Sequence, residues 1–545
     1  MATEFNAVQL ELFNNRLAAV AEEMGAVLGQ AGFSPNIKER RDFSCAVLDA
    51  NGEMVTHAAH IPVHVGSTPL SVKAAISATS MTDGDVVILN DPYQGGTHLP
   101  DVTMVAPVFM PSGRSKSKPF AYVANRAHHA DIGGISPGSM TLSTNVHQEG
   151  LRIPPVHLCR RGDYVEETLA LFLANTRVGE ERLGDIAAQV AALRVGVERM
   201  IQLCSRYRRA TVTTAMDELQ AYSMRLVRSM VSGIPPGSYQ AEDFLDGDGT
   251  GTENIRIALN LTVKGRELLV DFRDSDDQVQ GPMNANLAVT TSAVFYVVAC
   301  LAGGAVPANR GMMKPVTIRT RAGSVVDCRY PAAVAGGNVE TSQRIVDVLI
   351  KALAQAIPER MPAASAGSMT NIALGGHDST RGRFFSYYET VAGGAGAGPT
   401  GPGCSAIQTH MTNTLNTPVE VLECYYPLKV LHYRLRRASG GRGLHRGGNG
   451  IDRKLEVLVP AELTLIGERR AAAPWGLAGG ENGSPGRDTL TQRKRSRRLE
   501  AKSMVRLAAG DQLRVQTPGG GGWGKPSDKK NEARSPRRPR ASRKS

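Results

Sequence analysis

The sequence predicts a multidomain protein of the mixed α/β (α+β) class, with mixed sheets, a helical arm and a strand-rich C-terminal region. Its 545 residues are enough for about two to four domains with sizeable cores. Hydrophobic residues make up 41% and charged residues 21%, as in folded globular proteins. The 58 glycines and 30 prolines place many residues in turns and loops. Helical and strand-like hydrophobic patterns both occur, which indicates both kinds of element.

The N-terminal stretch predicts one helix followed by short strands. Apolar residues recur at helical spacing over residues 3–32, and Gly32 suits a C-terminal cap. The turn-forming residues 49–52 then predict a hairpin. Short hydrophobic runs between Gly- and Pro-rich loops predict strands at residues 44–48, 54–56, 86–90, 102–108 and 120–123.

A long helical arm is predicted next, followed by a domain boundary. Within residues 164–231, Ile186, Val190 and Leu193 belong to an apolar stripe at helical spacing. The pattern changes to strand-like alternation after a Gly- and Pro-rich segment. We therefore predict three regions: a metal-binding region with the helical arm (1–232), a strand-rich mixed α/β region with helices at 287–301 and 344–357 (233–524), and a basic, disordered tail (525–545).

The net charge of +12 does not indicate a nucleic-acid partner, because it is concentrated in two short runs. Residues 525–545 hold nine Lys/Arg against two Asp/Glu, and residues 493–498 hold five more basic side chains. The tail also lacks aromatic side chains on which bases stack. The most apolar segment, 293–301, is far shorter than the ~20 residues that span a bilayer, so we expect no membrane contact. Seven scattered cysteines, without a C-x-x-C pair or a signal peptide, predict a cytoplasmic protein.

Histidine clustering indicates a metal or acid–base site. Eight of the 12 histidines lie within residues 57–157. His98 and Asp101 are three residues apart in a glycine-containing loop after a predicted strand, and His128 or His129 follows the next strand. Two imidazoles and one carboxylate suit Mn, Fe or Zn. The spacing alone is equally compatible with side chains that cap turns and hydrogen-bond buried loops.

Other polar motifs provide candidate catalytic and binding residues. Asp131, close to the histidine pair, and Glu149 are candidates for proton transfer, because a carboxylate near a metal can be tuned for it. Residues 336–343, which include Glu340, predict a helix start that either binds an anion or only caps the helix. The Gly-x-Ser-x-Gly sequence at 134–138 does not predict a serine hydrolase, because Pro137 has no N–H for an oxyanion. The glycine run at 393–398 lacks the order of a P-loop, so we expect no ATP site in this chain.

Several segments carry distinctive motifs in a fixed order: residues 36–44, 59–64, 90–101, 127–134, 148–155, 336–343, 409–414 and 517–524. Together they resemble the hydantoinase B/oxoprolinase family. The resemblance covers about residues 5–526 and is specific, because many motifs match in the same order.

This resemblance implies a B-type subunit of an ATP-dependent hydrolase of cyclic amides such as hydantoins or 5-oxoproline. A separate A-type subunit would bind ATP and activate the ring by phosphorylation, so a hetero-oligomer is expected. In the related acetone and acetophenone carboxylases, two histidines and an aspartate hold a divalent metal, and those positions match His98, Asp101 and His128 here. We assign Asp131 or Glu149 to proton transfer and Glu340 to substrate binding.

Two alternatives remain from the sequence. One is the metal-binding subunit of an ATP-dependent ketone carboxylase, which bicarbonate dependence would distinguish from a hydrolase. The other is a noncatalytic scaffold for the A-type subunit, which the presence of His98, Asp101 and His128 together disfavours.

Overall fold

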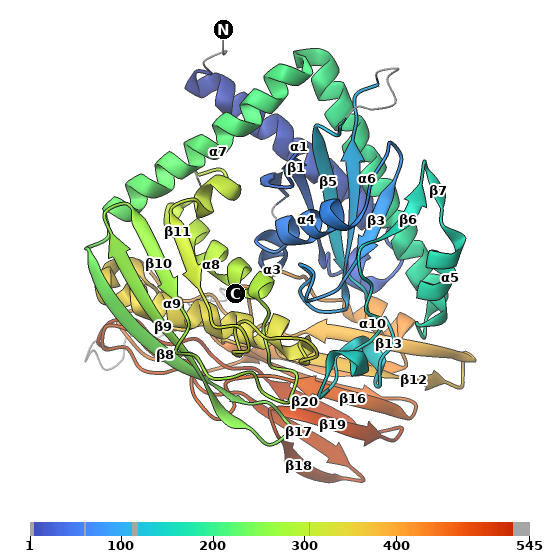
Figure 1. Cartoon of the computed structure of the whole chain (residues 1–545). Coiled ribbons are helices and arrows are strands. Elements are labelled where there is room, and N and C mark those ends of the chain that lie inside the picture. The colour runs from blue at the N-terminus through green and yellow to red at the C-terminus, as the bar shows by residue number, and fades with distance from the viewer. Residues whose placement is uncertain (1–4, 59–60, 112–117, 305, 527–545) are drawn as a thin grey trace, which may run out of the picture.

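The computed structural model describes residues 5–526 apart from 59–60, 112–117 and 305. It contains an N-terminal sheet with helices, a second helix-covered sheet and a C-terminal pair of sheets (Figure 1). The predicted α+β class is therefore confirmed. Most of the predicted basic tail, from residue 527 onward, lies outside the described residues.

The N-terminal sheet is antiparallel throughout and contains the strands that the sequence predicts. Its strands in spatial order are β2 (Met54–His57), β1 (Phe43–Asp49), β5 (Ala121–His128), β4 (Asp101–Val108), β3 (Val86–Leu89), β6 (Val156–Arg160) and β7 (Asp163–Tyr164). β5 extends past the predicted 120–123, because it pairs with both β1 and β4 along its length. Its polar Asn125 and Arg126, which break the hydrophobic pattern, are buried and hydrogen-bonded.

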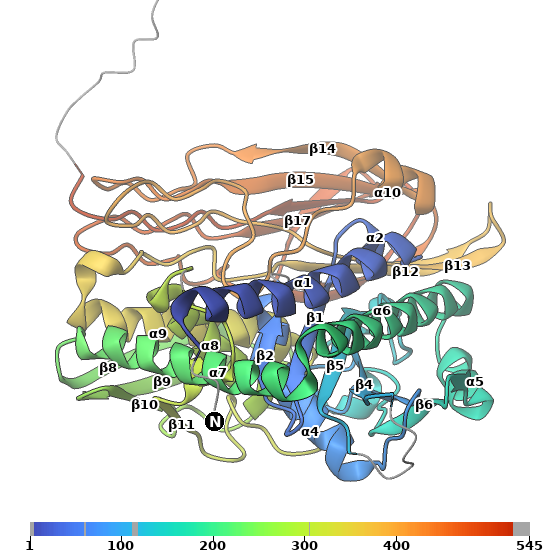
Figure 2. The same ribbon diagram turned by 90° about the horizontal axis from the view of Figure 1, so that it is seen from above.

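Helices cover both faces of this sheet and continue as the predicted arm. The helices of this region are α1 (Ala7–Ala31), α2 (Pro35–Lys38), α3 (Pro62–Val65), α4 (Thr68–Ala78), α5 (Glu166–Ala174), α6 (Gly179–Tyr207) and α7 (Arg209–Ser232). α1 and α6 pack against each other (Figure 2). α1 confirms the predicted first helix: Asn6 forms its capping box and Gly32 its C-terminal cap. None of the helices in the described ranges is long and apolar enough to cross a membrane.

The second sheet starts directly after the predicted boundary. It has the order β11 (Val316–Arg319), β10 (Glu267–Asp271), β9 (Glu253–Lys264) and β8 (Gly237–Gly247). α9 (Ser342–Ala356) packs on β8 and β9, and α8 (Leu287–Ala302) packs on α9. Both helices were predicted, and they share one large apolar core with this sheet.

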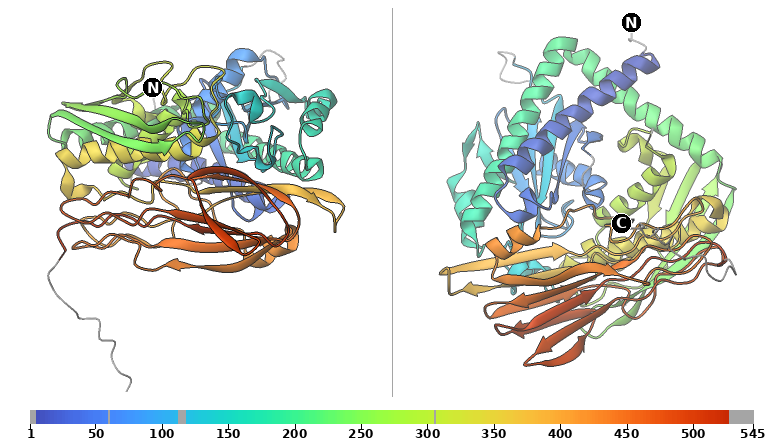
Figure 3. Two further views of the ribbon diagram at one scale, coloured as in Figure 1. Left: turned by 90° about the horizontal axis from the view of Figure 1, so that it is seen from below. Right: turned by 180° about the vertical axis from the view of Figure 1, so that it is seen from behind.

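Two further sheets form the C-terminal part. The first has the order β13 (Arg383–Thr390), β12 (Asn371–Asp378), β16 (Ala461–Ile466) and β19 (Lys502–Leu507). The second has the order β14 (Leu428–Arg436), β15 (Gly450–Val457), β20 (Gln512–Gln516), β17 (Arg487–Gln492) and β18 (Arg495–Leu499), and α10 (Val419–Tyr425) precedes β14. Leu463 and Leu513, from different sheets, belong to one buried core, so the two sheets pack face to face (Figure 3).

A buried cluster of charged side chains connects the second sheet to this sandwich. Arg344 on α9 lies 3.2 Å from Asp347, 3.1 Å from Glu468 after β16 and 3.6 Å from Asp243 on β8. Arg469 contacts both Asp243 and Asp347 at 2.7 Å. Because these groups are almost fully removed from water, each charge depends on its partners for stabilisation.

Replacing Arg344 with Met tests this cluster. The change leaves buried carboxylates short of one cation, so we expect a destabilisation of about 3–5 kcal/mol. Arg228→Met, which breaks the exposed Arg228–Glu267 pair, should cost less than about 1 kcal/mol. Thermal and urea denaturation measure both, and equal losses in the two variants would contradict the role of the cluster.

Candidate metal centre

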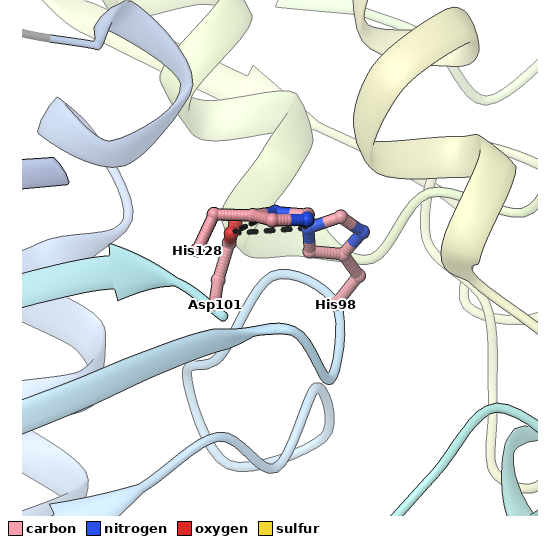
Figure 4. Close-up of side chains that lie close together, drawn as sticks. All are labelled: His98, Asp101 and His128. Carbon is pink, nitrogen blue, oxygen red and sulfur yellow. Dashed lines mark hydrogen bonds and ion pairs between the residues drawn. The ribbon is translucent and has the colours of Figure 1, made fainter. Parts of the chain in front are cut away.

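The strand register brings Asp101 and His128 together. Asp101 is the first residue of β4 and His128 the last of β5, and the two are directly paired. His98 comes from the β3–β4 loop, three residues before Asp101 (Figure 4). This loop depends on glycine, because a Cβ at Gly96 would lie 2.5 Å from the carbonyl oxygen of Asn90.

Three donor atoms converge at this point. Asp101 Oδ1 lies 3.0 Å from His98 Nε2 and 3.1 Å from His128 Nδ1, and the two nitrogens are 3.2 Å apart. All three side chains are at most 3% exposed. Among the described residues, these three side chains form a group of His, Cys, Asp or Glu close enough together to hold a metal ion.

Asp101 is fixed by partners on its other oxygen. Oδ2 accepts hydrogen bonds from Thr97 Oγ1 at 2.6 Å and Asn338 Nδ2 at 3.3 Å, and it lies 3.4 Å from His64 Nε2. Burial alone raises the pKa of Asp101, but His98 and His64 together with the hydrogen bonds lower it well below its usual value. Asp101 is therefore an anion, and its other oxygen, Oδ1, points at the two imidazoles.

The donor set fits a first-row divalent ion. Burial lowers the pKa of His128, which favours its neutral, ligating form. The outer nitrogens, His98 Nδ1 and His128 Nε2, are buried without a hydrogen-bond partner in the described part of the chain. With their protons on these outer atoms, His98 and His128 would offer the lone pairs of Nε2 and Nδ1 to a metal ion. Donors about 3 Å apart are compatible with metal–ligand distances of about 2.0–2.2 Å.

The structure separates His128 from His129, which the residue spacing alone did not. His129 Nε2 lies 2.9 Å from Gln189 Oε1 on α6, and its ring packs edge-on against Phe172. It therefore faces the helix and not the donor cluster. His60, another member of the histidine-rich segment, lies outside the described residues.

Tyr388 on β13 supports His128 from the second half of the chain. The two rings are stacked, with centroids 4.5 Å apart and planes inclined by 17°. The Tyr388 hydroxyl donates to Asn371 Oδ1 at 2.8 Å, and Asn371 Nδ2 donates to Glu340 Oε1 at 2.7 Å. Arg40 also lies over the Tyr388 ring, 5.1 Å from its centroid. The stacked Tyr388 ring thus supports the plane of His128, and the hydrogen bonds behind it help to hold Tyr388.

Glu340 lies at the far end of that chain, in a π-helical turn (Gly337–Thr341) where the sequence predicts a helix start. Burial raises the pKa of Glu340 to about 8, with a further contribution from Glu468. Its Oε1 accepts three hydrogen bonds, from Met369 N, Thr370 N and Asn371 Nδ2. Glu340 is therefore mainly protonated near neutral pH, and its predicted substrate-binding role stays a prediction.

The two predicted proton carriers have different surroundings. Glu149 is buried, and burial raises its pKa to about 7. Its Oε1 accepts from Ser143, Val334 and Ala335, while Oε2 has no partner in the described ranges. Glu149 is thus free to gain or lose a proton close to neutral pH.

Asp131, by contrast, has both oxygens occupied. Oδ1 accepts from the backbone N–H groups of Gly133 and Arg177, and Oδ2 from Gly138 N and the Arg177 guanidinium at 3.0 Å. These contacts organise the loop after β5. A catalytic role for Asp131 stays a prediction that this geometry does not favour.

Sequence reasoning missed His64, Asn338 and Tyr388. His64 and Asn338 lie in segments that carry the family resemblance, and that was the available signal. Tyr388 has no local signal, because only the pairing of distant strands brings it to His128.

The fold and the donor set define an α+β protein whose buried centre of two imidazoles and one carboxylate is suited to a divalent metal. A family model described as Hydantoinase B/oxoprolinase matches residues 6–526. The chain belongs to the hydantoinase B/oxoprolinase family.

Relatives extend this assignment. 5-Oxoprolinase 1 of Arabidopsis thaliana is 39% identical over 549 residues, covering 95% of this chain but 42% of the relative, so the chain spans about two fifths of that protein. The putative B subunit of a D-/L-hydantoinase from a Pseudomonas species is 28% identical, with 97% and 92% covered. The crystal structure of ATP-dependent caprolactamase from Pseudomonas jessenii has a TM-score of 0.88 at 28% identity, with 96% and 92% covered.

Removing the ring of Tyr388 tests the support of His128. Tyr388→Leu should weaken metal binding about 10- to 100-fold, the usual effect of losing an outer partner of a ligand. Tyr388→Phe keeps the stacked ring and should keep most of the affinity. Titration calorimetry with Mn²⁺ and Zn²⁺ measures both. Equal affinity in the Leu variant and the wild type would show that the stack does not position His128.

The raised pKa of Glu340 predicts a pH-dependent stability. The folded state holds this proton up to about pH 8, whereas the unfolded carboxyl releases it near its ordinary value of 4.5. The contribution of Glu340 therefore lowers stability as pH rises from about 5 to 8, on the order of 1 kcal/mol per pH unit. Glu340→Gln should gain stability relative to the wild type across this window, measured by melting temperature. A constant difference between pH 5 and 8 would contradict the protonated state.

Proposed function

We propose that this chain is the B-type component of an ATP-dependent cyclic amide hydrolase, and that it opens a lactam ring after an ATP-binding A-type subunit has activated it. The buried convergence of His98, Asp101 and His128, in a chain of this family, is the observation that carries the proposal. One relative named as a 5-oxoprolinase and another named as the putative B subunit of a hydantoinase support the substrate class and the need for a partner. We place this reaction in the cytoplasm, where ATP is available.

The chemistry follows from the difficulty of attacking an amide. Resonance makes the lactam carbonyl carbon a poor electrophile. Phosphorylation of the carbonyl oxygen by the partner weakens that resonance and makes the carbon easier to attack. A divalent ion held by His98, Asp101 and His128 would supply a Lewis acid that lowers the pKa of water towards ~7. Mn, Zn and Fe all suit this donor set.

We assign the transfer of the water proton to Glu149. Glu149 Oε2 is assigned to accept a proton from the attacking water, because its pKa near 7 lets it be ionised at neutral pH. The same atom would then return the proton to the ring nitrogen as the C–N bond breaks. This leaves an acyl phosphate, which a second water would hydrolyse to the carboxylate and inorganic phosphate. Ser143 Oγ and two backbone N–H groups hold Oε1, so only Oε2 is left to exchange protons.

His98→Ala tests the proposal. Loss of one of three donors should abolish stoichiometric metal binding and lower ring opening by more than about 100-fold, beyond the usual effect of an outer-shell change. ATP turnover by the A-type partner should remain. Metal analysis of the purified chain, and ring-opening assays with partner, ATP and either hydantoin or 5-oxoproline, measure these effects.

His377→Ala is the matched control, because His377 is exposed on β12 and packs against Phe384 away from the donor cluster. It should bind metal and open rings as the wild type does. Unchanged ring opening in His98→Ala would contradict the metal role. Activity only on ketones in the presence of bicarbonate would replace the hydrolase with the carboxylase, and a wild-type chain without metal would support the scaffold.

A further inference from the structure

Within the described chain, the Arg152 guanidinium forms one loose ion pair and donates no hydrogen bond. Its nearest carboxylate oxygen, Asp91 Oδ2, is 3.8 Å from Nε, beyond hydrogen-bonding distance. The side chain is 31% exposed, and its guanidinium lies 4.7 Å from the centroid of the Tyr330 ring. A guanidinium stacked on an aromatic face keeps its N–H groups available for two oxygens of a carboxylate or phosphate.

Tyr330 is held in place although it is exposed. Half of its surface (51%) is accessible, yet its ring meets the Tyr93 ring edge-on at 5.4 Å. Its hydroxyl lies 2.8 Å from His147 Nε2, and the two rings are perpendicular at 5.7 Å. An exposed aromatic ring is ordinary on a protein surface, but one fixed by Arg152, Tyr93 and His147 is preorganised.

Hydrogen bonds of Asn90 connect this cluster to the loop of the metal centre. The side chain of Asn90 accepts from Ile153 N at 2.7 Å and donates to Leu151 O at 2.9 Å, on either side of Arg152. The same amide donates to Leu99 O at 2.7 Å, next to His98. One side chain therefore fixes the backbone of Arg152 relative to that of His98.

The cluster is also connected to Glu149 through residues 330–335. The hydroxyl of Tyr93 donates to Ala332 O, and two residues further on Val334 N and Ala335 N donate to Glu149 Oε1. Tyr330 belongs to this same short segment. The Tyr93 and Tyr330 rings are thus connected, through residues 330–335, to the carboxyl to which we assign proton transfer.

We propose that Arg152, with Tyr330 and His147, binds an anionic oxygen pair carried by the substrate. This inference rests on the proposed function. Two groups have this chemistry: a carboxylate on the ring, as in 5-oxoproline, and the phosphoryl group of the activated amide. Either one would be oriented by Arg152.

Titration calorimetry on the full chain, without partner, tests the site separately from ring opening. The probes are 5-oxoproline, its uncharged analogue 2-pyrrolidinone and inorganic phosphate. In Arg152→Gln we expect binding of the recognised anion to weaken at least about 10-fold, as for loss of a charge-assisted hydrogen bond. The affinity of Arg152→Lys for that anion should lie between those of the wild type and Arg152→Gln, because lysine keeps the charge but not the paired N–H groups.

Arg225→Gln is the matched control, because Arg225 lies over Tyr222 on α7 in a similar stack, 6.0 Å from the ring centroid. It should bind every probe as the wild type does.

Arg152-dependent binding of 5-oxoproline identifies a ring carboxylate as the ligand, and Arg152-dependent binding of phosphate identifies the phosphoryl group. Absence of anion binding in the wild type, or equal binding in Arg152→Gln, would overturn the inference. A chain that binds an anion through Arg152 but opens no ring with its partner would contradict the proposed function alone.

Discussion

The orientation of the Asp101 carboxylate is the constraint on which the rest of the site depends. Thr97 and Asn338 hold Oδ2, so Oδ1 faces both His98 and His128. A buried carboxylate is costly unless its partners compensate for lost hydration. Here the compensation comes from a loop on one side and a π-helical turn on the other. The centre therefore requires that the N-terminal sheet and the segment before α9 be assembled correctly.

Both halves of the chain build this centre, although the three donors come from the first. Tyr388 stacks on His128 from the C-terminal sandwich, and Arg40 of the N-terminal region donates to Thr390 and to the carbonyl of Tyr388. The buried charges around Arg344 connect the second sheet to the same sandwich. Stability and site geometry are thus coupled. A change that separates the C-terminal sandwich from the rest of the chain removes the Tyr388 ring from His128 even when all three donor residues are unchanged.

The sequence predicts what local patterns determine. The period of apolar residues predicted α1, α8 and α9, and strand runs bounded by glycine predicted most of the N-terminal sheet. The three-residue spacing of His98 and Asp101 made them candidates for one site. The choice of His128 over His129 depended on the register of β4 and β5, and Tyr388 on the pairing of distant strands. Such long-range pairing has no local signature, so residue spacing alone does not predict it.

Anomalous diffraction from crystals of the chain, collected at the absorption edges of Mn, Fe and Zn, tests the central claim most directly. The account predicts one peak about 2.0–2.2 Å from His98 Nε2, Asp101 Oδ1 and His128 Nδ1. A well-ordered centre without a peak, in which Asp101 Oδ1 accepts hydrogen bonds from both imidazoles, would contradict it and make the cluster structural.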